Sequence, residues 1–580
     1  MDVKNRPRYS RDGATKSRME LCQESGGLGL ERVALFLSAV STDLEGTVVI
    51  QAEHAHEAFG IDSGAVIAHQ HTEGLDGGHF YKILHILKRA QADIKLLQCF
   101  CPPKLYKRWI FVYNGGKIPD ESHYSSFAGI FNRNFGRDLQ SRTDVFGEID
   151  MKFGFYTLGC KTNQYETQAM ERLFAAKGHE IADFDQDCDG YIINTCSVTA
   201  VADKKNRAVI RRCRREHENA LIGVCGCYSQ HDPDAAKKLG ADVIGGSADR
   251  MGFVEMMIQT ALDRQKREKL DEALKRREFE VLPAGSLTGR TRAMLKVQDG
   301  CRNFCSYCII PYSRGPVRSA PLELAVAQAK ELAEAGYREI VLTGIEIASW
   351  GVDLPDKPGA DVLIAAVCLA VPGCRVRLGS LEPRIITQEF AENLRKLPNL
   401  CPQFHLSMQS GCDTVLLRMK RKYDTARYLQ SVEILKKYFP GCAITTDMIV
   451  AFPGETEEEF AQSLAFIQKC GFADMHIFPY SRRPGTPADK MPGQHDNATK
   501  DARSKAAITV AAKMSEEYRK NLIGSTQEVL FEEQEDGFFT GHAPNYVKVY
   551  VKGEGLHNEV RDVTITHIFK DGVFGQLQQM

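Results

Sequence analysis

The sequence predicts an α/β protein built from a parallel-sheet domain, a partial (β/α)6 barrel and a small all-β barrel, in that order. Strand-like and helix-like segments alternate in two series, and such alternation is typical of βαβ units with parallel strands. Near the C-terminus, short β-rich segments separated by Gly and Asp predict the third part. Residues 1–150 show no sustained periodicity and are an N-terminal extension of unassigned structure.

The first series fills residues 151–265 and predicts the parallel-sheet domain. Amphipathic segments at 166–177 and 200–216 predict helices between its strands. The expected strands lie at residues 152–157, 191–194, 221–224 and 243–244. A charged stretch over residues 263–280 follows and predicts a helix. We assign residues 266–286 as the charged linker between the first two domains.

The second series fills residues 287–520 and predicts the partial barrel. Active sites of such folds lie at the C-terminal ends of the strands. The expected strands are residues 294–297, 339–342, 375–378, 403–407, 444–450 and 476–480. Helices are expected at 322–335 and 457–469, and the small all-β barrel occupies residues 522–580.

The composition excludes several classes of protein. The formal net charge is -1, so a nucleic-acid partner has to bind a local basic patch. The longest apolar run, residues 362–372, is too short for a membrane helix, and the charged start is unlike a secretory signal. We therefore expect a cytoplasmic protein. Its 18 cysteines indicate metal or redox chemistry, because the cytosol keeps thiols reduced.

Three of these cysteines form a C-x3-C-x2-C motif just after the first strand of the barrel series. They are Cys301, Cys305 and Cys308. Three thiolates can hold a [4Fe–4S] cluster and leave its fourth iron open to a substrate, here S-adenosylmethionine (SAM). The alternative is a structural zinc site, but zinc prefers four closed ligands, and no second cysteine pair stands nearby.

Three further cysteines each follow a predicted strand of the first domain: Cys160, Cys196 and Cys227. The carboxyl ends of parallel strands share one edge of a sheet, so these thiols can meet there. Three unrelated thiols remain the alternative, and Cys225 competes with Cys227. We expect Cys225 to point into the core, Cys213 to lie in a helix, and Cys368, Cys374, Cys442 and Cys470 to be small buried side chains.

Together these motifs resemble the methylthiotransferase family of radical-SAM enzymes from residue 151 to about residue 577. Similar stretches are LTGIEIASWG, LGSLEP, HLSMQSGCDTVLLRMKRKY, TTDMIVAFPGETEEEF and HIFPYSRRPGTPA. The resemblance implies a flavodoxin-like domain, a radical-SAM barrel and a TRAM domain that binds RNA. It also implies two [4Fe–4S] clusters, one on each cysteine triad. One departure is Ala451, where the family usually has Gly.

By the same resemblance, SAM lies across the strand ends of the barrel. Candidates for contacting it are Thr343, Gly344, Ser380, Glu382 and Gln409, each of which is equally readable as a structural polar group. No residue is assigned as catalytic. The implied partners are tRNA, through its anticodon stem-loop, and an electron donor such as flavodoxin or ferredoxin, with no membrane and a monomeric chain.

The motif LGCKTNQYE resembles the subgroup that methylthiolates C2 of N6-threonylcarbamoyladenosine beside the anticodon, with a second SAM as methyl donor. The alternatives are a methylthiotransferase for isopentenyladenosine in tRNA or for an Asp of a ribosomal protein, and a non-catalytic iron–sulfur protein that binds RNA.

Local positive charge offers candidate RNA contacts, with a solvated protein surface as the alternative. The first group lies on one predicted helix: Lys204, Lys205, Arg207, Arg211, Arg212, Arg214 and Arg215. A second group lies near the barrel mouth: Arg418, Lys420, Arg421, Lys422, Arg482 and Arg483. In the last domain the candidates are Asn545, Tyr546 and Lys548.

Overall fold

The computed structural model describes residues 150–285 and 291–578 in full, and before them the backbone of five short strands. The chain divides into two compact units, Met1–Gly147 and Glu148–Met580. The strands of the first unit form an antiparallel sheet in the order β1-β2-β3-β5-β4. They span Leu37–Thr42, Val48–Ala52, Val66–Ala68, Lys95–Cys99 and Arg108–Val112. The sequence predicts no secondary structure for these residues. Strands of six residues or fewer are too short to give a recognisable hydrophobic periodicity.

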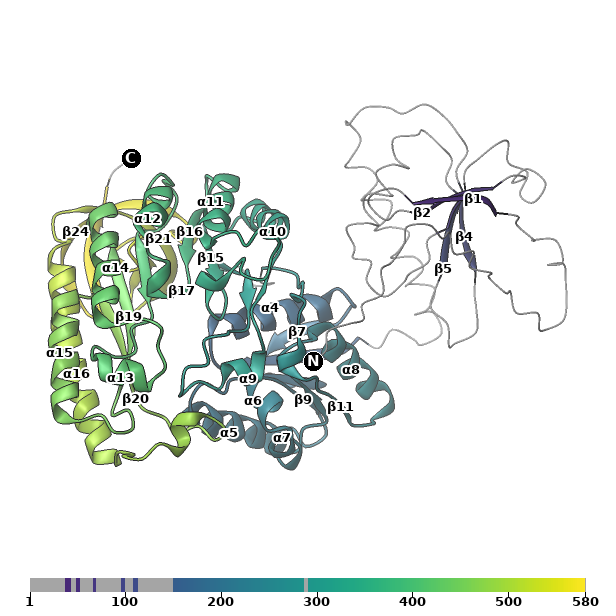
Figure 1. Cartoon of the computed structure of the whole chain (residues 1–580), viewed down its shortest axis with the longest axis horizontal. Coiled ribbons are helices and arrows are strands. Elements are labelled where there is room, and N and C mark those ends of the chain that lie inside the picture. Colours follow the sequence, from purple (N-terminus) through teal and green to yellow (C-terminus); the bar gives the residue numbers. More distant parts are fainter. Residues whose placement is uncertain are drawn as a thin grey trace, which may run out of the picture. The chain divides into compact units, whose positions relative to one another are not determined.

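The second unit begins with a six-stranded parallel sheet in the order β11-β10-β9-β8-β6-β7 (Figure 1). Its strands in chain order are Lys152–Thr157, Glu180–Asp183, Gly190–Thr195, Leu221–Gly226, Val243–Gly245 and Arg267–Lys269. Helices α4 to α8 span Lys161–Ala175, Ala200–Glu216, Cys227–His231, Pro233–Lys238 and Arg250–Asp263. The four expected strands are present, and the parallel-sheet domain is confirmed.

The predicted helical linker is wrong. Helix α8 ends at Asp263. The next element is the three-residue strand β11, which pairs with β10 at the edge of the sheet. A short 3-10 turn, η1 (Ala273–Lys275), follows. The charged side chains pair locally, as Arg267 does with Asp263 at 2.5 Å. An edge strand tolerates charges on its open side, so charge density alone did not distinguish it from a solvated helix.

The central part is an open parallel barrel made of two sheets, β12-β15-β16 and β17-β18-β19-β20. A single bridge from Val376 to Leu400 connects the two, and in the described residues β12 does not pair with β20. The strands span Arg292–Lys296, Glu339–Thr343, Arg375–Leu378, Ser380–Leu381, Gln403–Leu406, Ala443–Val450 and Asp474–Pro479. The six expected strands are present. Three two-residue strands were not predicted: β17, and the antiparallel pair β13 (Gln298–Asp299) and β14 (Arg318–Ser319).

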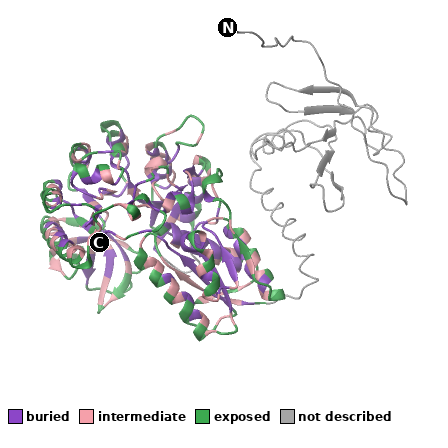
Figure 2. Cartoon of the chain, turned by 60° about the horizontal axis from the view of Figure 1, so that its bottom comes forward, coloured by how far each residue is buried: buried purple, intermediate pink, exposed green. Residues whose placement is uncertain are grey.

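Helices cover one face of the open barrel. Helices α10 to α16 span Leu322–Glu334, Ala360–Ala370, Gln388–Leu394, Asp413–Arg418, Thr425–Tyr438, Glu457–Cys470 and Asn497–Lys520. Figure 2 shows buried strands beneath helices whose outer faces are exposed. The expected core cysteines Cys368, Cys374, Cys442 and Cys470 are all buried here. None of the helices in the described ranges is both long and apolar enough to span a membrane.

The last part is a closed barrel in the order β21-β22-β23-β25-β24, which confirms the predicted small all-β barrel. Its strands span Thr526–Glu535, Phe538–His542, Lys548–Val551, Val560–Phe569 and Gly572–Leu577. It packs against the start of β16, where Arg377 donates to the carbonyl of Pro544 at 2.9 Å. Arg375 donates to the carbonyls of Glu528 and His542, both at 3.2 Å.

A fully buried ion network joins the six-stranded sheet to the open barrel. Glu166 of α4 accepts from Arg250 at 2.6 Å, and its partners across the junction are Lys296 of β12 at 3.0 Å and Arg314 at 2.8 Å. Burial favours the neutral acid, but the three cations outweigh it and hold the pKa of Glu166 well below its ordinary value. The network therefore fixes the two sheets against each other.

Candidate active site

The C-x3-C-x2-C thiols lie in the loop between β13 (Gln298–Asp299) and helix α9 (Ile310–Arg314). Cys305 is buried and Cys301 and Cys308 are half-buried. Burial raises the pKa of Cys301 to about 11 and that of Cys308 to about 12, and each thiol feels the charge of its neighbours. A bound iron would favour the thiolate form of Cys301 and Cys308 against this burial.

Arg421 supplies a positive charge to this thiol triad. It donates from Nη1 to Sγ of Cys305 at 3.2 Å and from Nε to the hydroxyl of Tyr423 at 2.9 Å. Its guanidinium also lies 4.8 Å from the centre of the Tyr423 ring. A donor on a cluster thiolate adjusts the reduction potential of an iron–sulfur cluster. Arg421, predicted as an RNA contact, is thus a half-buried group that donates to a thiol.

The other three thiols meet at the carboxyl ends of β6, β8 and β9. Cys160 is exposed at the start of α4, whereas Cys196 and Cys227 are buried. Burial raises the pKa of Cys196 to about 12, and the charges of Cys227 and Cys160 add to that rise. Gly159 has φ +107°, and a Cβ there would stand 2.5 Å from Cβ of Cys196. A glycine is therefore required for the strand ends to come this close.

The competing cysteines are accounted for by their positions. Cys225 lies inside β9 and packs in the core with Phe153, as expected. Cys213 is buried on α5, also as expected. Of the pair Cys225 and Cys227, only the second reaches the sheet edge.

One short helix connects the two triads. Cys308 lies two residues before α9, and Arg314 is the last residue of that helix. Arg314 donates from Nε to Sγ of Cys227 at 3.3 Å and from Nη2 to Asn163 at 2.8 Å. A five-residue helix is about 7.5 Å long. The two groups of thiols therefore lie near opposite ends of α9.

The described residues contain no group of three or more His, Cys, Asp or Glu that closes around a single metal ion. A structural zinc site draws its four ligands into one compact tetrahedron. A cubane holds its thiolates on separate irons and needs a wider triangle.

The candidate SAM contacts lie at the carboxyl ends of the barrel strands, on the same edge as the C-x3-C-x2-C loop. Thr343 ends β15 and is followed by Gly344, and Ser380 lies in β17. Glu382 is already occupied, because it accepts from Nε of Arg384 at 2.7 Å. The backbone of Gln409 (φ +70°) bridges to β19 through Asp447 and Ile449, at 2.9 and 2.8 Å. At the end of β19, buried Ala451 has φ +56°, a conformation that favours the Gly usual in the family.

Glu346 is a site residue that the sequence analysis missed. Its backbone N–H donates to Gln298 at 2.9 Å, and its Oε2 accepts from Asn303, inside the C-x3-C-x2-C loop, at 3.4 Å. Its Oε1 is buried without a hydrogen-bond partner, and burial raises the pKa of the carboxyl to about 7. An acceptor left open beside the loop fits a ligand ammonium group. Glu346 lies within LTGIEIASWG, one of the stretches that resemble the family, so its position in that stretch could have identified it as a candidate.

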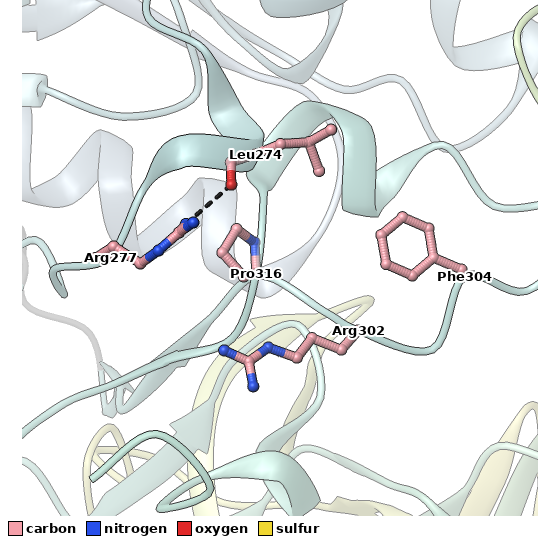
Figure 3. A pocket seen from close by; sticks show the side chains of 5 residues that line it. All are labelled: Leu274, Arg277, Arg302, Phe304 and Pro316. Atoms are coloured by element: carbon pink, nitrogen blue, oxygen red, sulfur yellow. Dashed lines mark hydrogen bonds between the residues drawn. The ribbon is translucent and has the colours of Figure 1, made fainter. Parts of the chain in front are cut away.

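The same loop borders a pocket of about 380 Å³ (Figure 3). Leu274, Arg277, Arg302, Phe304 and Pro316 line it, and the Phe304 ring is 41% exposed with φ +47°. The C-x3-C-x2-C loop therefore contributes two residues, Arg302 and Phe304, to the lining of this pocket.

The basic candidates divide into paired and unpaired groups. Arg214 is tied to Asp242 and the carbonyl of Gly240, and Arg483 pairs with Asp203 at 2.5 Å. Arg418 pairs with Glu459 at 2.5 Å, Arg482 with Asp489 at 2.6 Å, and Arg212 with Asp185 at 3.8 Å. Exposed cations for which the described residues offer no ion pair include Lys204, Lys205, Arg211, Lys420 and Lys422.

The candidates in the closed barrel have structural contacts as well. Tyr546 lies under the guanidiniums of Arg377 at 4.6 Å and Arg292 at 5.4 Å, and its hydroxyl accepts from Arg292 at 3.1 Å. Asn545 is buried, and its Oδ1 accepts from the backbone of Val547. Lys548 pairs with Glu535 at 2.6 Å.

Comparison with known families gives two matches. The family model described as "Radical SAM superfamily" matches residues 295–467, and that of "Uncharacterized protein family UPF0004" matches residues 152–246. Among solved structures, the radical SAM methyltransferase TsrM from Kitasatospora setae has 12% sequence identity to this chain and a TM-score of 0.44. The match covers 68% of this chain and 81% of the TsrM chain.

Curated relatives are closer. The chain is 42% identical to "Threonylcarbamoyladenosine tRNA methylthiotransferase MtaB" of Bacillus subtilis, over 69% of this chain and 90% of the relative. It is 36% identical to the MtaB of Thermotoga maritima, over 72% of this chain and 95% of that relative. It is 32% identical to "tRNA-2-methylthio-N(6)-dimethylallyladenosine synthase" of Finegoldia magna, over 69% and 88%. The chain therefore belongs to the methylthiotransferase family of radical-SAM enzymes.

Proposed function

We propose that this protein methylthiolates tRNA, and that its substrate is C2 of N6-threonylcarbamoyladenosine next to the anticodon. The observation that supports the proposal most is the placement of two thiol triads at the two ends of α9, each with an arginine on one thiol. The substrate follows the relatives, since the two MtaB enzymes have higher identity to this chain than the dimethylallyladenosine synthase does.

Two cofactor sites are part of the proposal. Cys301, Cys305 and Cys308 hold the [4Fe–4S] cluster that binds SAM, and Cys160, Cys196 and Cys227 hold a second [4Fe–4S] cluster. When bound, these groups and two SAM molecules supply the radical that breaks an unactivated aromatic C–H bond and the methylthio group that replaces the hydrogen. An electron donor such as flavodoxin or ferredoxin is needed, because one SAM is cleaved by reduction.

The chain's own residues position these reactants. Glu346 accepts from the amino group of SAM with its free Oε1, and Thr343 and Gly344 flank the same strand end. Arg314 and Arg421 hold one thiolate of each triad by a charge-assisted hydrogen bond. The exposed cations Lys204, Lys205 and Arg211 on α5 contact tRNA phosphates, and the protein acts as a monomer.

The test is anaerobic reconstitution followed by mass spectrometry of nucleosides. We expect about eight irons per chain and a methylthiolated N6-threonylcarbamoyladenosine from tRNA that carries the unmethylthiolated base. Product on isopentenyladenosine tRNA alone, or on a ribosomal protein alone, would replace the proposed substrate. Failure to cleave SAM to 5′-deoxyadenosine would leave a non-catalytic iron–sulfur protein.

A further inference from the structure

We propose that Lys161 determines substrate specificity by binding, through its ammonium group, the carboxylate on the N6 substituent of the modified adenosine. This inference rests on the proposed function and assigns a specific contact within it. Lys161 directly follows Cys160 and is the first residue of α4. Its side chain is exposed to solvent.

Lys161 lies near charged groups of the open barrel and the closed barrel. The charged or ionisable groups that act on it come from three barrel strands and the closed barrel: Arg292, Glu339, Arg377 and Tyr546. Alternate residues of these strands, such as Ile340 and Val376, pack in the core beneath the helices. Because side chains alternate along a strand, Glu339 and Arg377 face the opposite, concave side. The charged groups that act on Lys161 therefore lie on the concave side of these strands, and Lys161 itself is accessible to solvent.

Lys161 is the cation of this group that has no carboxylate partner among the described residues. Arg377 is paired with Glu339 at 2.7 Å, and Arg292 is paired with Glu532 at 2.8 Å. Among the described residues no carboxylate lies within ion-pair distance of Lys161. A lysine without an ion pair, beside arginines that already occupy the nearby carboxylates, favours an anionic ligand group.

The chemistry of the base requires a recognising group at this position. C2 of adenine and the C6 that carries N6 both neighbour N1, so the N6 substituent leaves the ring on the same edge as C2. A residue that binds the substituent must then lie close to the group that delivers sulfur to C2. The threonylcarbamoyl group ends in a carboxylate. Lys161, next to a thiol of the second triad and on a flexible four-carbon stem, meets both requirements.

The experiment measures binding of synthetic anticodon stem-loops to the anaerobically reconstituted full chain by fluorescence anisotropy. One stem-loop carries N6-threonylcarbamoyladenosine and the other carries its methyl ester, which is neutral but otherwise the same. We expect the wild-type protein to bind the acid at least about tenfold more tightly than the ester, as a charge-assisted hydrogen bond provides. Lys161→Met should bind the two equally, and Lys161→Arg should keep the preference. Lys330→Met, an exposed lysine on α10, is the matched control.

Each outcome decides the inference. Equal binding of acid and ester by the wild-type protein overturns it, whether or not the variants assemble their clusters. A preference that persists in Lys161→Met also overturns it, and so does an equal loss for both stem-loops, which would assign Lys161 to a backbone phosphate. If the preference is found but no methylthiolated base forms, the proposed function fails while the carboxylate site remains. If product forms without a preference, only the carboxylate site is rejected.

Discussion

The two thiol triads are built in opposite ways. Cys301, Cys305 and Cys308 lie in one loop, so eight consecutive residues contain the whole set. Cys160, Cys196 and Cys227 come from three strand ends and meet only because β6, β8 and β9 are adjacent and parallel. The first triad depends on local sequence and the second on the fold. Yet both have the same electrostatic design, with one arginine donating to one thiol.

The largest expected effect comes from removing one thiol of each triad. Cys301→Ala should abolish both SAM cleavage and methylthiolation. Cys160→Ala should lose methylthiolation by at least about a thousandfold while SAM cleavage continues, because Cys160 is an exposed residue that makes no cap bond to α4. The measurement is mass spectrometry of 5′-deoxyadenosine and of tRNA nucleosides.

Iron content and a matched variant control this comparison. Each substitution should leave about four irons per chain. Cys225→Ala removes a thiol that lies close to Cys227 in the sequence but is packed in the core, and it should retain both reactions. Normal methylthiolation by Cys160→Ala would show that the second triad is not a cluster site.

The next effect is on the coupling between the two triads. Glu166→Gln leaves Arg250, Arg314 and Lys296 without their shared carboxylate, and should lower the free energy of unfolding by about 3–5 kcal/mol. Because the pKa of Glu166 is depressed, this stabilisation is present above the unfolded pKa and is lost as the pH falls through the folded value. Denaturant titration measures it.

The control is Glu180→Gln, which removes an exposed partner of Lys152 and should cost no more than about 1 kcal/mol. If the two variants lost similar stability, the buried network would not be what joins the sheet to the barrel.

The comparison also explains how far the sequence could be interpreted. Strand positions and the edge on which Cys160, Cys196 and Cys227 gather were predictable, because alternation sets the topology and topology sets the shared edge. Residues 263–280 were predicted wrongly as a helix, because an edge strand and a solvated helix carry similar charge. The sequence could not tell the paired Arg214, Arg421 and Arg483 from free cations, because their partners lie far along the chain.

The role of Glu346 illustrates the same limit at the site. A glutamate in a recognised stretch looks like any polar residue, and only the fold shows that one of its oxygens is buried without a partner. The sheet formed by β1 to β5 could not be predicted from the sequence for a different reason, since its short strands give no periodic hydrophobic pattern.

A smaller effect separates the two arginines. Arg421→Lys should make the potential of the SAM cluster more negative by up to about 60 mV, the one-electron equivalent of about 1.4 kcal/mol, because a donor to Cys305 is weakened. Arg314→Lys should do the same to the second cluster through Cys227. Redox titration followed by EPR measures both. Each variant is the control for the other, and equal shifts at both clusters in either variant would contradict separate tuning.

The smallest effect lies on α5, the helix that follows Cys196. Arg211→Gln removes an exposed cation, and Arg214→Gln removes one that is tied to Asp242. If α5 contacts tRNA, Arg211→Gln should weaken binding about equally for all tRNAs and reduce the salt slope by about 0.9, the value for one phosphate contact. Arg214→Gln should instead lower stability and leave the slope unchanged, because the guanidinium of Arg214 is already hydrogen-bonded within the protein.

Filter binding over a range of salt concentrations measures both slopes. An unchanged slope in Arg211→Gln would assign the helix to a solvated surface, and RNA recognition would then depend on the barrel mouth and the closed barrel.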